Sequence, residues 1–161
     1  MQTDKETILA SLLTRVRSDL QQASLAAMEA STGAKDESMK SDGKYDTRGI
    51  EAGYLASAQL RRVEELKLEL QMLEELPTRQ FAETDEVALG ALVEIKHKGQ
   101  TRHYFMCSTA GGTILEANGK AVLVISVFSP LGDAALGLKA GDVFELETPT
   151  EKREYEIVRL S

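Results

Sequence analysis

The first half of the chain repeats apolar and small residues at alternating steps of four and three positions. The series consists of Leu9, Leu13, Val16, Leu20, Ala23, Ala27 and Ala30. This spacing is the heptad seam of a coiled coil, because it keeps one apolar stripe along a single face of a long helix. Thr3 and Glu6 have the spacing of a capping box, so we expect the helix to start there, and Gly33 is placed to end it.

A second seam follows and predicts a partner helix. It consists of Ala56, Gln59, Val63, Leu66, Leu70 and Leu73, with the glutamine as its polar exception. Pro77 stops this helix, because proline cannot continue one. A polar connection, roughly residues 34–44, would let the two stripes bury each other. The pattern therefore predicts an antiparallel coiled-coil hairpin over residues 1–77, with its tip near 33–47 and two helices of about equal length.

After Pro77 the pattern changes to short runs rich in β-branched and aromatic residues, separated by glycines. The predicted strands are 87–89, 92–98, 102–108, 121–126, 143–147 and 154–160. Between the fourth and fifth of these, Ser129, Pro130 and Gly137 suit the N-cap, first-turn and C′ positions of a short helix. Residues 78–161 are therefore predicted to form a small α+β domain.

Composition limits the class of protein further. Hydrophobic residues make up 42% and charged residues 28% of the chain, which is typical of a folded rather than a disordered protein. A net charge of -7 disfavours direct binding to duplex DNA through its phosphates. The single Cys107 fits a reducing compartment, and we recognise neither a signal peptide nor a membrane span. We therefore expect a cytoplasmic protein that contacts neither duplex DNA nor a membrane.

One motif in the second half resembles the C-terminal signature of the Gre-type (GreA/GreB) transcript-cleavage factors. It reads ISVFSPLGDAALGLKAGD over residues 125–142, and the family pattern is approximately S-P-L/I-x-x-A-L-x-G-x-x-x-G-D. A strand, a Thr-Pro turn and a last strand follow in the family, and here the turn falls on Thr148 and Pro149. The resemblance implies an α+β protein with an N-terminal antiparallel coiled-coil hairpin followed by a small FKBP-like antiparallel-sheet domain. It also implies RNA polymerase as the partner, and we expect the factor to be a monomer.

The hairpin tip departs from the family. In Gre-type factors two tip acids enter the secondary channel of the polymerase and help to hold a second magnesium ion. Aligned through Tyr45, these acids fall on Ser38 and Ser41, whose neutral hydroxyls are poor ligands. Asp36, Glu37 and Asp42 are the remaining candidate ligands of magnesium shared with the polymerase, and no other cofactor is expected. The tip set is Ser38, Ser41, Asp42, Lys44, Tyr45 and Asp46. The alternative interpretation is that these residues form only a solvated, charged connection between the two helices.

The resemblance also implies a docking loop before the short helix, formed by Phe128, Ser129 and Pro130, on the rim of the secondary channel. Ser129 and Pro130 are explained equally well as cap and first-turn residues. The family commonly carries a polar residue at the position of Phe128. This aromatic side chain is therefore either a partner anchor or a core residue.

Catalytic chemistry finds little support in the sequence. His97 and His103 flank a predicted hairpin turn, with no third ligand or carboxylate partner evident for a metal site. With two histidines and one cysteine, the sequence offers no convincing Ser/His/Asp or Cys/His arrangement for nucleophilic catalysis. We therefore expect that the protein is not an enzyme.

The sequence therefore predicts a secondary-channel factor that modulates elongation, pausing or initiation without strong cleavage stimulation, and meets nascent RNA only inside the polymerase. A genuine stimulator of transcript cleavage in backtracked complexes is the first alternative. A peptidyl-prolyl isomerase or chaperone is disfavoured, because the chain has no Trp and only four Tyr and four Phe to line a pocket. A dimerising coiled-coil adaptor is disfavoured by the alanine-rich seam.

Overall fold

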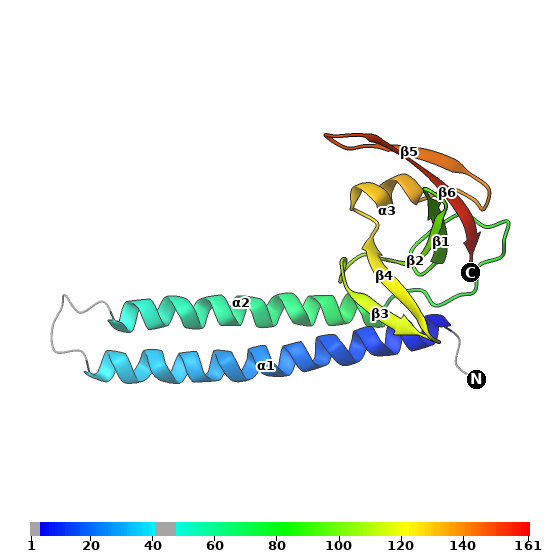
Figure 1. Ribbon diagram of the computed structural model, residues 1–161. Coiled ribbons are helices and arrows are strands. Elements are labelled where there is room, and N and C mark those ends of the chain that lie inside the picture. The colour runs from blue at the N-terminus through cyan, green and yellow to red at the C-terminus, as the bar shows by residue number, and fades with distance from the viewer. Residues whose placement is uncertain (1–3, 41–47) are drawn as a thin grey trace. The chain divides into compact units, whose positions relative to one another are not determined.

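The structure is a computed structural model that describes residues 4–40 and 48–161, and there it contains three helices and six strands (Figure 1). The helices are α1 (Asp4–Lys40), α2 (Arg48–Glu74) and α3 (Pro130–Ala135). The strands are β1 (Leu92–His97), β2 (Gln100–Cys107), β3 (Ile114–Ala117), β4 (Lys120–Ser126), β5 (Val143–Glu147) and β6 (Lys152–Leu160). No helix among these residues is both long and apolar enough to cross a membrane.

The chain divides into two compact units. One consists of Leu13–Gln71, and the other joins the residues up to Leu12 with Met72–Ser161. The predicted ranges 1–77 and 78–161 differ from this division. The first turns of α1, up to Leu12, and the last residues of α2, from Met72, belong to the same unit as the sheet.

The unit Leu13–Gln71 is an antiparallel pair of helices, α1 and α2, as Figure 1 shows. Its buried apolar residues are Val16, Ala23, Ala27, Ala56, Val63 and Leu66. All six lie on the predicted seams, which confirms the heptad interpretation for this part. Gly33, however, does not end α1, which continues to Lys40. The helices contain 37 and 27 residues, so the expectation of equal lengths was wrong.

The start of α1 belongs to the other unit and does not follow the heptad. Ile8 and Leu12 are fully buried there, whereas the predicted Leu9 and Leu13 are only partly buried. Beside them the buried Lys5 donates hydrogen bonds from Nζ to the carbonyl oxygens of Arg79 (2.5 Å) and Ser161 (3.2 Å). These bonds tie the first turns of the helix to the chain that follows α2.

The six strands form one sheet in the order β3-β4-β2-β1-β6-β5. β2 and β4 run parallel and the other neighbours antiparallel, so the α+β class is confirmed but the sheet is mixed rather than purely antiparallel. The strand Ile114–Ala117 was not predicted. The strand predicted at 87–89 is wrong, because Val87 exchanges backbone hydrogen bonds with the chain after α3, at Gly137 (2.8 Å) and Leu138 (2.7 Å), and not with the sheet.

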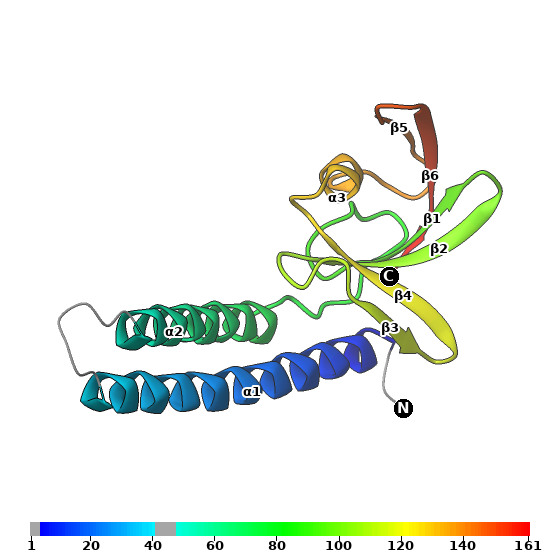
Figure 2. The same cartoon turned by 60° about the vertical axis from the view of Figure 1, so that its left-hand side comes forward.

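The core of the sheet unit combines buried residues of β1, β2, β4, β6 and α3 with residues of the segment before β1. The helix α3 packs against β4 and β5, and Figure 2 shows these elements. The buried residues of the core are Phe81, Val87, Ala91, Val93, Ile95, Tyr104, Met106, Ile125, Val127, Ala135, Tyr155, Ile157 and Leu160. The core therefore fixes the position of the loop between β4 and α3.

Candidate functional site

The loop between β4 and α3 is held by hydrogen bonds around two serines. Ser129 Oγ donates to the carbonyl of Ser126 (2.6 Å) and accepts from the backbone N–H of Gly132 (3.2 Å). The backbone N–H of Ser129 donates to the same carbonyl of Ser126 (3.0 Å). Ser129 is thus the N-cap of α3, and Pro130 occupies its first turn, as predicted.

Gly132 is required by the close approach of α3 to the end of β4. A Cβ atom at this position would lie 1.9 Å from the carbonyl oxygen of Ser126 and 3.1 Å from Ser129 Oγ. No side chain fits there without moving backbone. Sequence reasoning did not single out Ser126 and Gly132, although both lie inside the quoted motif.

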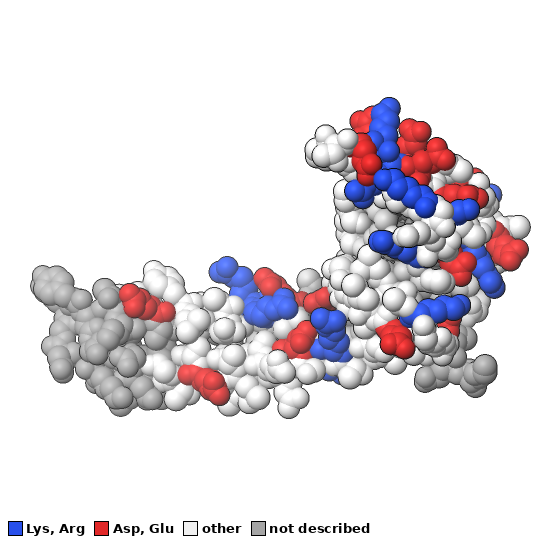
Figure 3. All heavy atoms as spheres, viewed as in Figure 1, with Lys and Arg blue, Asp and Glu red and all other residues white. Residues whose placement is uncertain are grey.

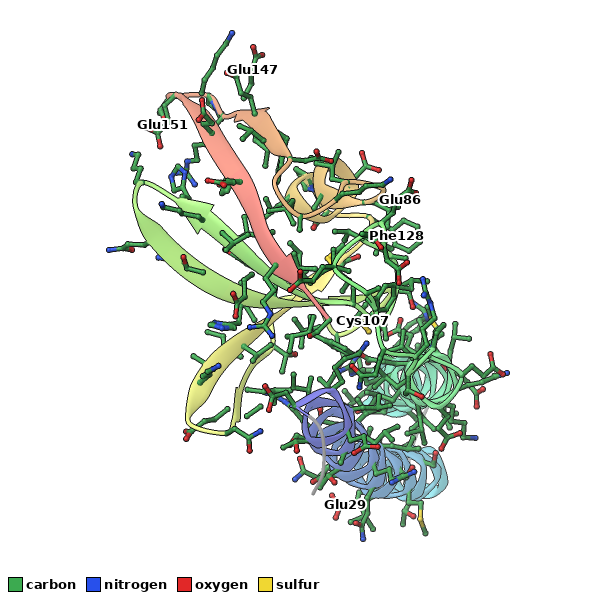
Figure 4. The ribbon with its side chains drawn as sticks, turned by 90° about the vertical axis from the view of Figure 1, so that its right-hand side faces the viewer. Glu29, Glu86, Cys107, Phe128, Glu147 and Glu151 are labelled. Carbon is green, nitrogen blue, oxygen red and sulfur yellow. The ribbon has the colours of Figure 1, made fainter. Side chains whose placement is uncertain are left out.

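Phe128 is the exposed residue of this loop. Its relative exposure is 79%, whereas its neighbour Val127 is buried in the core. Its backbone N–H donates to Ser126 Oγ (3.1 Å), so the backbone carrying the ring is fixed while the ring faces solvent. Figure 4 shows Phe128 at the surface beside α3. The structure therefore rules out a core role and leaves this aromatic side chain available to a partner.

The residues predicted at the hairpin tip fall into two groups. Asp36, Glu37 and Ser38 lie within α1, which extends to Lys40, rather than in the connection expected from residue 34. The others, Ser41, Asp42, Lys44, Tyr45 and Asp46, lie outside the described residues. Their assignment as magnesium ligands or tip residues stays a prediction.

The two histidines do not form a joint site. His103 Nε2 lies 3.1 Å from Glu94 Oε1, so a carboxylate partner exists that the sequence did not reveal. His97 Nδ1 lies 2.9 Å from the carbonyl oxygen of Glu154, and in the β1–β2 register it opposes Gln100 rather than His103. Within residues 4–40 and 48–161, no group of three or more His, Cys, Asp or Glu side chains could hold a metal ion.

Comparison with known proteins identifies the family. Residues 82–161 match the family model described as transcription elongation factor, GreA/GreB, C-terminal. The transcription inhibitor protein Gfh1 of Thermus thermophilus is 30% identical over 136 residues, which cover 83% of this chain and 83% of the relative. The chain belongs to the GreA/GreB family. The Gfh1 match is longer than the range 82–161, so the similarity extends into the helical half.

The chain is also similar to a second relative and to a solved structure. The transcription elongation factor GreA of Amoebophilus asiaticus is 30% identical over 125 residues, covering 76% of this chain and 73% of the relative. The crystal structure of Gfh1 from Thermus thermophilus is 27% identical, covers 96% of this chain and 93% of that chain, and has a TM-score of 0.39. The loop at Phe128 lies inside the part that matches the GreA/GreB model.

Proposed function

We propose that this protein binds RNA polymerase through the loop before α3 and modulates transcription elongation, pausing or initiation. The observation that supports this most directly is Phe128, an exposed aromatic ring on a loop that hydrogen bonds and Gly132 hold in place. Exposed, pre-positioned aromatic residues are common anchors of protein interfaces, because they bury a large area at a small cost in conformational entropy.

The proposal includes no strong stimulation of transcript cleavage and no catalytic centre in the chain itself. Ser38 and Ser41 stand where the family acids are expected, and a hydroxyl is a poor ligand for magnesium. A similarity to a protein named a transcription inhibitor supports a regulatory role of this kind. In this proposal the factor acts as a monomer in the cytoplasm, where it meets nascent RNA only within the polymerase.

The experiment compares polymerase binding by the full-length protein and by Phe128→Ala. We expect the substitution to weaken binding by at least ~10-fold, as truncation of a central aromatic anchor does. The thermal transition should stay within ~2 °C of the native protein, because a mostly exposed ring contributes little to the core.

Val158→Ala is the matched control, since Val158 is an exposed apolar residue of β6 in the same unit. It should leave polymerase affinity unchanged within about twofold. Equal affinities of native protein and Phe128→Ala would refute the loop as the docking site, and a native protein that fails to bind polymerase would refute the function itself.

A further inference from the structure

A second feature of the sheet unit is a polar pocket at the end of β1, β2 and β6. The pocket has a volume of about 200 Å³. It is lined by Ile95, His97, Lys98, Gln100, Arg102, Tyr104, Glu151, Arg153 and Tyr155. Most drug-sized ligands occupy larger and mainly apolar pockets of roughly 300–1,000 Å³. The size and polarity of this pocket therefore suit a small charged ligand.

The lining carries more positive than negative charge, although the whole chain has a net charge of -7. Lys98, Arg102 and Arg153 contribute three cations, and Glu151 contributes the single carboxylate. Figure 3 shows Lys and Arg side chains interspersed with Asp and Glu side chains on the visible face of the sheet unit. The local excess of cations indicates an anion as the ligand.

The cations are positioned by rigid local structure. Lys98 and Gly99 have φ angles of 49° and 77°, which is typical of the two-residue turn of a β-hairpin. His97 stacks on Tyr155 with ring centroids 4.6 Å apart, and Tyr155 forms a hydrogen bond with Arg153. The floor of the pocket is thus aromatic and buried, while the charged groups stand at its rim.

Glu151 already acts as an internal anion in this pocket. Its two carboxylate oxygens lie 2.8 Å from Arg153 Nε and 3.4 Å from Lys98 Nζ. The hydrogen bonds from Arg153 and Lys98 lower the pKa of Glu151, so it is ionised at neutral pH. Among the described residues, no carboxylate forms an ion pair with Arg102. The Arg102 side chain forms a hydrogen bond with Tyr104 instead, so the Glu151 carboxylate leaves the charge of Arg102 without an anionic partner among the described residues.

We propose that this pocket binds a phosphate or pyrophosphate group, held by Lys98, Arg102 and Arg153. A phosphate group offers three or more oxygens where a carboxylate offers two, so it engages the donors that Glu151 leaves over. The ligand competes with the Glu151 carboxylate for Lys98 and Arg153. In Figure 4, Glu151 and Phe128 lie on opposite sides of the unit, so this site is separate from the proposed docking loop.

The test is isothermal titration calorimetry of the full-length protein with sodium phosphate, pyrophosphate and ATP, each at constant ionic strength. We expect saturable binding of one pyrophosphate per chain, weakened at least ~10-fold in Arg102→Gln and in Arg153→Gln. Glu151→Gln should bind about threefold or more tightly, because it removes the competing carboxylate. Binding of ATP tighter than pyrophosphate would show that the group is recognised as part of a nucleotide, and equal affinities would show recognition of the group alone.

Two controls match the charge changes outside the pocket. Arg159 of β6 opposes Glu94 in the sheet and does not line the pocket, so Arg159→Gln should change affinity by less than about twofold. Glu147→Gln removes an acid of the same β5–β6 hairpin, one that pairs with Lys152 instead, and should not strengthen binding. A native protein without saturable binding, or an Arg159→Gln variant as weak as Arg102→Gln with both variants folded, would overturn the proposal.

Discussion

Replacing Gly132 by alanine tests whether the approach of α3 to β4 builds the loop at Phe128. The new Cβ would lie 1.9 Å from the carbonyl oxygen and 2.8 Å from the carbonyl carbon of Ser126, where ordinary contact begins at 3.4 Å. Both neighbours are backbone atoms, and that oxygen already accepts two hydrogen bonds from Ser129. The helix or the strand end must therefore shift by more than 1 Å to admit the methyl group.

The expected loss of stability is about 1–3 kcal/mol. Overpacking typically costs about 1–3 kcal/mol. A weakened N-cap at Ser129 adds about 1 kcal/mol. The better helix propensity of alanine returns at most about 1 kcal/mol. For a chain of this length, such a loss lowers the melting temperature by roughly 2–12 °C.

Differential scanning calorimetry of the full-length protein measures this change, and near-ultraviolet circular dichroism reports the packing of Tyr104 and Tyr155 in the sheet unit. Gly53→Ala is the matched control, because Gly53 lies in α2 and a Cβ atom there would meet nothing within 4 Å beyond its own stretch of helix. It should stabilise the protein by about 0.5–1 kcal/mol. A Gly132→Ala variant as stable as the native protein, with unchanged polymerase binding, would refute the requirement for glycine.

Two further predictions concern the start of α1 and the hairpin tip. Burial, with a smaller contribution from Arg79, lowers the pKa of Lys5 to about 8. In the unfolded chain the Lys5 ammonium keeps its proton up to a pKa near 10.5. The free energy of unfolding should therefore rise between about pH 8 and pH 10.5, by at most ~3 kcal/mol relative to Lys5→Met. Urea denaturation of both proteins at pH 7.5 and 10 measures this, and parallel pH profiles would contradict it. At the tip, the native protein should stimulate cleavage of backtracked RNA weakly or not at all, whereas Ser38→Asp with Ser41→Glu should gain activity. Robust native cleavage that disappears when Asp36, Glu37 and Asp42 are changed to alanine would instead identify those acids as ligands.

Local signals in the sequence determined the elements whose stability is mostly local. The heptad seams predicted the helical hairpin, because a stripe repeated over many turns leaves a long helix one apolar face to bury. Ser129, Pro130 and Gly137 predicted α3 correctly, since caps and a left-handed C′ residue act within a few positions of the chain. Gly33 failed as a stop signal because one glycine costs a long helix only about 1 kcal/mol.

Tertiary structure decided every feature that depends on distant partners. Two examples are the parallel pairing of β2 with β4 and the backbone hydrogen bonds between Val87 and the chain after α3. Both join segments far apart in the sequence, so no local pattern predicts them. Whether Phe128 was buried depended on where the β4–α3 loop meets the core. The cationic pocket combines the β1–β2 hairpin with Glu151 and Arg153 of the β5–β6 hairpin, which lie some fifty residues further along the chain. Its residues look like ordinary surface charges in sequence, because only the sheet order places β6 beside β1.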